Sequence, residues 1–174
     1  MFFNKKKEKN QDPAQDANDN DFFMSNVLLV VDGSNNSLTA TQFAINYAQK
    51  TGCHLLAAFI IDTATMDYLQ QMRIFIQDER EDLERDMEQK GVRYLERVKC
   101  MAENRNVSIE TTLRRGRLHQ TILQVARDGK IDAIILAGWK HEIQQKDSTS
   151  IERQLILDLA DCPVIVVKKK HMHP

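Results

Sequence analysis

The chain has 174 residues, of which 42% are hydrophobic and 28% charged, as in an ordinary globular domain. Its 24 Lys plus Arg and 25 Asp plus Glu give a formal net charge of -1, which excludes binding of nucleic acid or acidic membranes through bulk positive charge. No stretch approaches the roughly 18–20 apolar residues that a membrane span needs. Three cysteines without CxxC spacing (Cys53, Cys100 and Cys162) indicate reduced thiols in the cytoplasm and no disulfide scaffold or zinc cluster.

Residues 1–25 differ in composition from the rest of the chain. They hold Pro13, three lysines at 5–7 and many Asn, Gln and Asp residues, so we expect a disordered, solvated N-terminal extension. It has no apolar h-region of a secretory signal. Phe2-Phe3 beside the lysines would give at most marginal contact with a membrane surface. Met24, just before the first predicted strand, is a second candidate start.

Apolar runs alternate with helical periodicity from residue 26 onward. A continuous apolar run is typical of a parallel strand buried on both faces, and spacings of three, four and seven are typical of helices. In chain order the sequence predicts strand 26–32, helix 36–51 stopped by Gly52, strand 54–61, a long helical stretch 66–104, strand 107–113, helix 118–128, strand 131–137, helix 151–160 and strand 164–167.

Five strands alternating with four helices predict an α/β fold, an open five-stranded parallel sheet with helices on both faces. Right-handed crossovers leave few arrangements, and a common one has the order 3-2-1-4-5. Ligands of such sheets bind at the carboxyl ends of the strands where the winding reverses, here between strands 1 and 4. This switch point places Asp32-Gly33-Ser34 beside residues 138–141.

Several classes of α/β protein lack their motif in this chain. Gly129-Lys130 has no upstream glycine of a P-loop, and neither a GxSxG elbow nor an HxGH-type motif of nucleotidyl transferases is present. A response-regulator receiver needs paired acids after strand 1 and an acceptor Asp after strand 3. Strand 1 ends with one acid, Asp32, and strand 3 ends in Leu113-Arg114-Arg115.

The strand endings resemble the universal stress protein family. Strand 1 runs into Val31-Asp32-Gly33-Ser34, strand 2 ends in Ile60-Ile61-Asp62, strand 4 ends in Ala137-Gly138, and the last helix–strand junction is 160–167. The resemblance covers about residues 26–168. It implies a universal stress protein-like domain over 26–170, of the adenine nucleotide alpha hydrolase-like fold, followed by a C-terminal tail at 171–174.

Family members that bind ATP share a motif after strand 4: Gly, two residues, Gly, about nine residues, then Gly followed by Ser or Thr. Glycines let backbone N–H groups approach phosphate oxygens. Here Gly138 keeps the first position, His141 and Ser150 replace the other glycines, and Ile151 follows. Trp139 replaces a small residue, and its indole would either fill the space of a ribose or phosphate or shield an adenine.

The resemblance therefore implies a degenerate site for ATP or AMP, with magnesium. Asp32 matches the contact to adenosine, or it only caps a turn. Ile60 matches a backbone contact to adenine, or it only packs in the core. Lys140 and His141 add positive charge, and the 148–150 hydroxyls either bind phosphate or only cap the last helix. The site would comprise Val31, Asp32, Gly33, Ser34, Ile60, Ala137, Gly138, Lys140, His141, Ser148, Ser150 and Ile151.

Two charged stretches have a structural and a functional interpretation. Seven of the eleven residues at 78–88 are acidic, which suits either a solvated helix face with pairs such as Glu81 with Arg85 or a surface that binds a partner. The arginines at 114, 115 and 117 are either solvated or clamp an anion.

The histidines other than His141 give no clear site. His54 and His119 have no evident carboxylate partner, and His171-Met172-His173 would be a poor metal site. We expect no catalytic residue and no bound metal.

The last strand, Val164-Ile165-Val166-Val167, lies at an edge of the predicted sheet, where a bare apolar strand promotes aggregation. Pairing it with a second copy gives a closed twofold dimer, as in family members that dimerise through the last strand. The sequence thus predicts a homodimeric regulatory stress-response binding protein that acts through a partner protein without turnover. The alternative is an ATP- or AMP-binding sensor at the switch point, and weak ATP hydrolysis ranks third.

Overall fold

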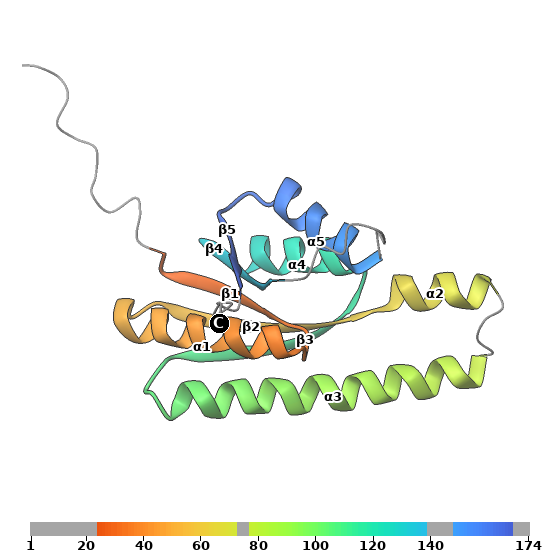
Figure 1. Ribbon diagram of the computed structural model, residues 1–174, viewed down its shortest axis with the longest axis horizontal. Helices are drawn as coiled ribbons and strands as arrows, with labels where there is room; N and C mark the ends of the chain where they lie inside the picture. Colours follow the sequence, from red (N-terminus) through yellow and green to blue (C-terminus); the bar gives the residue numbers. More distant parts are fainter. Residues whose placement is uncertain (1–23, 73–76, 139–147, 169–174) are drawn as a thin grey trace, which may run out of the picture.

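The computed structural model describes residues 24–72, 77–138 and 148–168. Five parallel strands form one sheet in the order β3-β2-β1-β4-β5, as predicted (Figure 1). Four of the strands coincide with apolar runs of the sequence, and β1 is buried along almost its whole length. The edge strand β3 is the exception, because polar residues make up most of it. The strands are β1 (Asn26–Val31), β2 (His54–Asp62), β3 (Ile109–Gly116), β4 (Ala133–Ala137) and β5 (Val164–Val167).

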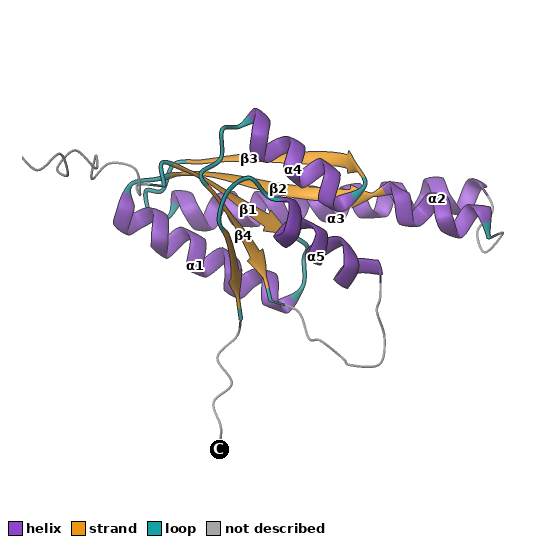
Figure 2. Ribbon diagram, turned by 90° about the horizontal axis from the view of Figure 1, so that it is seen from above, coloured by secondary structure: helices purple, strands orange, loops and turns teal. Residues whose placement is uncertain are grey.

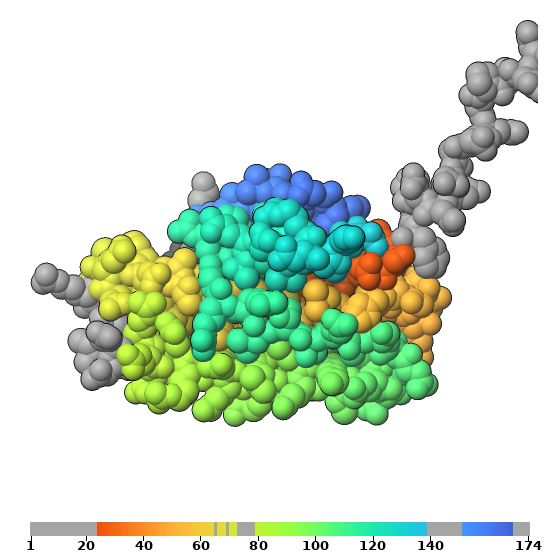
Figure 3. All heavy atoms as spheres, turned by 180° about the vertical axis from the view of Figure 1, so that it is seen from behind, coloured from red at the N-terminus to blue at the C-terminus, as the bar shows by residue number. Residues whose placement is uncertain are grey.

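Helices cover both faces of the sheet (Figures 1 and 3). Helices α1 (Asn35–Thr51) and α3 (Gln77–Glu103) lie on one face, and α4 (Leu118–Asp128) and α5 (Ser148–Leu159) lie on the other. Successive side chains of a strand point to opposite faces, so Val27 and Leu29 of β1 join one core cluster and Leu28 joins the other. This burial on both faces explains why the strand is apolar at every position.

The prediction of a single helical stretch over 66–104 is wrong. The chain forms α2 (Thr63–Gln71) and α3, which lie side by side and extend past the ends of the strands (Figures 2 and 3). Arg80 of α3 joins them, with Nη2 2.6 Å from a carboxylate oxygen of Asp67 and Nη1 2.5 Å from Oε1 of Gln70. The hydrogen bond to Glu84 and the Asp67 carboxylate raise the pKa of Arg80. One straight helix of that length would span roughly 58 Å, far beyond the core that Met66 and Leu83 both reach.

Three other boundaries refine the predictions. Gly52 ends α1 in the left-handed conformation with φ of 75°, as expected. Strand β3 continues to Gly116 and does not end at 113, because Arg114, Arg115 and Gly116 pair with the end of β2. Helix α5 begins at Ser148, before the predicted 151.

The predicted N-terminal extension and the tail at 171–174 lie outside the described residues, apart from Met24 and Ser25. Within the described ranges, no helix is long and apolar enough to cross a membrane. All three cysteines are free: Cys53 is buried, Cys162 is half-buried and Cys100 is exposed.

Candidate functional site

The turn after β1 is built by Asp32-Gly33-Ser34. The Ser34 N–H donates to Oδ1 of Asp32 at 2.8 Å, which is an Asx turn. The Ser34 hydroxyl accepts the N–H of Ser37 at 3.1 Å and caps α1. The sequence interpretation of this triplet as a turn and helix start therefore holds, and one Asp32 oxygen is used by it.

Gly33 is required at this turn for two reasons. Its φ is 76°, which L side chains rarely adopt. A Cβ here would also lie 2.3 Å from a ring carbon of Tyr94 on α3. That ring stacks on Phe59 of β2 with centroids 6.3 Å apart, so α3 closes directly over the end of β1.

Gly138, directly after β4, contacts both α1 and β5 at the switch point. Its carbonyl accepts a hydrogen bond from Nδ2 of Asn36 at 2.7 Å, and its N–H donates to the carbonyl of Val167 at 2.7 Å. A Cβ at Gly138 would lie 2.9 Å from that carbonyl oxygen. The close approach of β5 is thus a structural reason for glycine here. Nothing in the local sequence pattern singled out Asn36.

The second oxygen of Asp32 is occupied from the other end of the chain. Nη2 of Arg153 on α5 donates to Oδ2 of Asp32 in an ion pair. The two side chains are 17% and 27% exposed respectively, so the pair is largely screened from water. The sequence analysis did not single out Arg153, because the two partners are 121 positions apart in the chain.

The neighbouring residue on α5 makes a second anchor. Oε2 of Glu152 lies 2.6 Å from Nδ1 of His119 and accepts the His119 backbone N–H at 2.9 Å. Both side chains are largely buried. The expectation that His119 lacks a carboxylate partner is therefore wrong, and so is that for His54, which lies 3.8 Å from Glu110. The packing of α5 on α4 supplies the first partner and the pairing of β2 with β3 the second.

The other predicted site residues divide into three groups. Val31, Ile60 and Ala137 are buried at the ends of their strands, as core packing requires. Ile151 is exposed on α5. Trp139, Lys140 and His141 lie outside the described residues, and so do the side chains of Ser148 and Ser150. The structure thus brings together Asp32, Gly33, Ser34, Gly138 and, unforeseen, Asn36 and Arg153.

Several members of the two charged stretches form ion pairs on the surface. In α3, Arg85 lies 3.0 Å from Asp82, where the sequence suggested Glu81. Arg115 lies 2.7 Å from Glu88 of α3. In the part of the chain that the structure describes, no group of three or more His, Cys, Asp or Glu side chains is placed to hold a metal ion.

The predicted dimer strand β5 lies at one edge of the sheet and pairs only with β4 among the described strands. Its four apolar residues are all half-buried. Strand β3, with Arg114 and Arg115, forms the opposite edge. The predicted places of both edge strands are therefore confirmed.

Comparisons with known proteins agree with this architecture. The model of the universal stress protein family matches residues 24–168. The universal stress protein MJ0531 of Methanocaldococcus jannaschii is 28% identical over 150 residues, which cover 82% of this chain and 81% of that protein. A family protein from Burkholderia pseudomallei has the same fold, with a TM-score of 0.65 and 17% sequence identity; the match covers 84% of this chain and 97% of that one. The structure of an Arabidopsis thaliana family protein with AMP bound has a TM-score of 0.60 and 15% sequence identity, and the match covers 84% of this chain and 92% of that one. The chain therefore belongs to the universal stress protein family.

Proposed function

We propose that this chain is a regulatory stress-response protein that acts as a homodimer, binds a partner protein and catalyses no reaction. The ion pair of Arg153 with Asp32 is the observation that carries the proposal. Ligands of this kind of sheet bind at the switch point, and in this chain α5 already supplies a cation to the carboxylate there.

The residues at the switch point do not fit a bound nucleotide well. Both oxygens of Asp32 have partners, Ser34 and Arg153. Gly138 is explained by its contact with Val167. The other two glycine positions of the ATP-binding motif hold His141 and Ser150, and residues with side chains at these positions do not offer the close backbone approach that glycine gives a phosphate. We therefore derive no chemical step through a nucleotide.

The second candidate function is an adenine nucleotide sensor. It is supported by the Arabidopsis relative that has AMP bound and by the position of Asp32 and Gly138 at the carboxyl ends of the neighbouring strands β1 and β4. Thermal unfolding with and without 5 mM AMP, or ATP with magnesium, separates the two candidates. A ligand at about 100 times its Kd stabilises by about 2.7 kcal/mol, a rise of several degrees in Tm. We expect no rise; a rise that Asp32→Ala abolishes would replace our proposal with the sensor.

The homodimer is supported by the exposed edge of β5. Val166 is half-buried and packs against neither core cluster, so Val166→Lys should block edge pairing without disturbing the core. We expect a dimer for the native chain and a monomer for this variant in light scattering coupled to gel filtration. The matched control is Thr111→Lys on the opposite edge strand. A monomeric native chain, or dimers in both variants, would contradict pairing through β5.

A further inference from the structure

The edge strand β3 leaves a row of backbone groups without a partner. The N–H of Leu55 on β2 donates to the carbonyl of Ser108, directly before β3, at 3.0 Å. Because the backbone groups of a strand point alternately to its two sides, the even-numbered residues of 110–114 also face β2. The N–H and C=O groups of Thr111 and Leu113 therefore point away from the sheet, and no described residue pairs with them. Such an edge is a template for a further strand.

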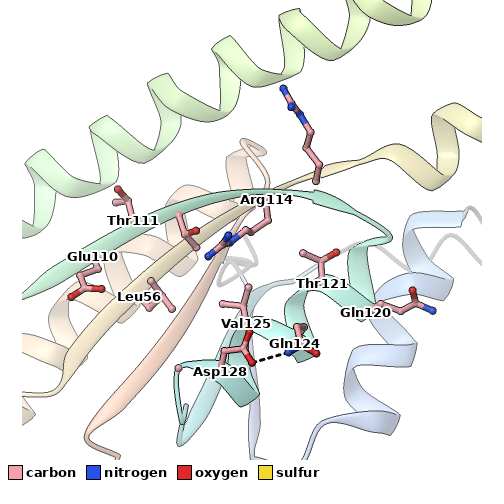
Figure 4. Close-up of a pocket in the computed structure, with 12 residues that line it drawn as sticks. Leu56, Glu110, Thr111, Arg114, Gln120, Thr121, Gln124, Val125 and Asp128 are labelled. Carbon is pink, nitrogen blue, oxygen red and sulfur yellow. Dashed lines mark hydrogen bonds between the residues drawn. The ribbon is translucent and has the colours of Figure 1, made fainter.

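The side chains beside this edge are not covered by a helix. A groove of about 800 Å³ lies between β3 and α4 (Figure 4). Glu110, Thr112 and Arg114 line it from β3, since alternate residues of a strand share a face. No residue of β3 is buried, in contrast to most residues of the central strands β1 and β4. Helix α4 therefore leaves room beside β3 for the side chains of a neighbouring strand.

The charges along this face have opposite signs on the two sides of Thr112. The Glu110 side chain is 76% exposed and lies 3.8 Å from Nε2 of His54. The Arg114 guanidinium points into the groove (Figure 4), and it has no hydrogen bond or ion pair with any residue that the structure describes. The strand thus presents an acid two residues before Thr112 and an unpaired base two residues after it.

This pattern is complementary to itself when two copies of β3 run antiparallel. If Thr112 lies opposite Thr112 of a second copy, Glu110 of each copy faces Arg114 of the other. In the same register Thr111 faces Leu113 of the other copy, and these are the residues whose backbone groups point outward. The backbone hydrogen bonds and the ion pairs are therefore satisfied together. The charged residues also fall at the non-hydrogen-bonded positions, where opposite side chains lie closest.

The charges select this register against others. A shift that places Glu110 opposite its own copy, or Arg114 opposite its own copy, brings like charges together and is destabilising. Charged side chains protect many edge strands against pairing, but here they protect against every register except one. The twofold axis through Thr112 makes the contact isologous, so that a second copy of this chain supplies the whole complementary surface.

We infer that β3 is a second self-association edge, at which two copies of this chain pair antiparallel around Thr112 with reciprocal Glu110–Arg114 ion pairs. This goes beyond the proposed function. Together with the proposed dimer through β5, it would join dimers into an open chain with a continuous sheet. Polar cross-strand pairs stabilise less than the burial of apolar side chains such as those of β5. The β3 contact should therefore be the weaker one and form only at protein concentrations well above those of gel filtration.

Sedimentation of the Val166→Lys variant from micromolar to millimolar concentration tests the inference while pairing through β5 is blocked. We expect a reversible monomer–dimer equilibrium. Adding Arg114→Glu should weaken it by at least about tenfold, or about 1.4 kcal/mol, because an acid then faces Glu110. The matched control is Arg117→Glu, an exposed arginine that does not line the groove, and it should leave the equilibrium unchanged. Urea unfolding of each variant checks that the domain stays folded.

A mixing experiment in the same background makes the test specific to the register. Glu110→Arg and Arg114→Glu should each prevent self-association, and an equimolar mixture of the two variants should form mixed dimers, because every pair then joins opposite charges. Thr111→Pro removes an outward N–H without breaking a bond to β2, and it should also prevent association.

Four results would overturn the inference. They are a Val166→Lys variant that stays monomeric at millimolar concentration, which would leave the edge to a strand of another protein, equal loss in Arg114→Glu and Arg117→Glu, a mixture that does not associate, and association that survives Thr111→Pro. Failure of the proposed β5 dimer is distinguishable, because it would appear as a monomeric native chain at micromolar concentration and would leave these experiments unchanged.

Discussion

Breaking the Asp32–Arg153 ion pair should loosen α5 from the end of β1. Exposed pairs contribute roughly 0–1 kcal/mol, and breaking a fully buried pair costs roughly 3–5 kcal/mol. With side chains 17% and 27% exposed, this pair lies between these limits, and we expect a coupling energy of about 1–2 kcal/mol. For a domain of this size the single variants should lower Tm by roughly 2–8 °C.

A double-mutant cycle with Asp32→Asn and Arg153→Gln measures this coupling by urea unfolding. The asparagine keeps an oxygen for the Ser34 N–H, so the turn is preserved and only the charge pair is removed. The matched control is the Arg127–Asp161 pair, 4.0 Å apart with side chains 53% and 80% exposed, for which we expect less than about 0.5 kcal/mol. Protein concentration is held fixed, because dimer formation would shift apparent stability. Equal coupling in the two cycles would refute the proposed anchoring of α5.

Three further predictions concern single positions. Gly33→Ala should lower the free energy of unfolding by at least about 1 kcal/mol more than Gly52→Ala, measured by urea unfolding. Both glycines have positive φ, but only Gly33 lacks space for a Cβ, which would meet the ring of Tyr94. Equal losses in the two variants would show that the Tyr94 ring moves freely. Glu152→Ala should cost about 1–3 kcal/mol in urea unfolding, since it leaves two donors of His119 without their acceptor, whereas the exposed Gln154→Ala should stay within about 0.5 kcal/mol. Burial, with Asp161 and Asp132, raises the pKa of the Cys162 thiol. The protonated Cys162 thiol should contribute fully to the free energy of unfolding below the ordinary thiol pKa of about 8.5, and this contribution should decline as the pH rises above that value. The free energy of unfolding of a Cys162→Ala variant should lack this decline, and an equal decline in the variant would contradict the prediction.

Much of the fold could be predicted because parallel strands leave a plain mark in the sequence. A strand such as β1, buried on both faces, must be apolar at successive positions, and its end in Asp32-Gly33-Ser34 supplies the turn chemistry. Right-handed crossovers then limit the strand order. These local rules located the switch point and the two edge strands correctly.

The break between α2 and α3 could not be found in this way. Periodicity continues through 66–104 because both helices use apolar residues to reach the same core cluster. A periodic pattern reports which face of a helix is buried, and it does not report where the core ends. The length of the sheet decided that the chain turns back.

The sequence by itself determined the strands, their order and the turn residues after β1, because backbone conformation and burial follow largely from near neighbours in the chain. Only the tertiary structure decided which polar and charged groups meet. Asp32 with Arg153, Asn36 with Gly138 and His119 with Glu152 join positions 121, 102 and 33 apart. Each contact exists because helix packing or the turn into α1 brings the two groups within hydrogen-bond distance, and no local pattern encodes that distance.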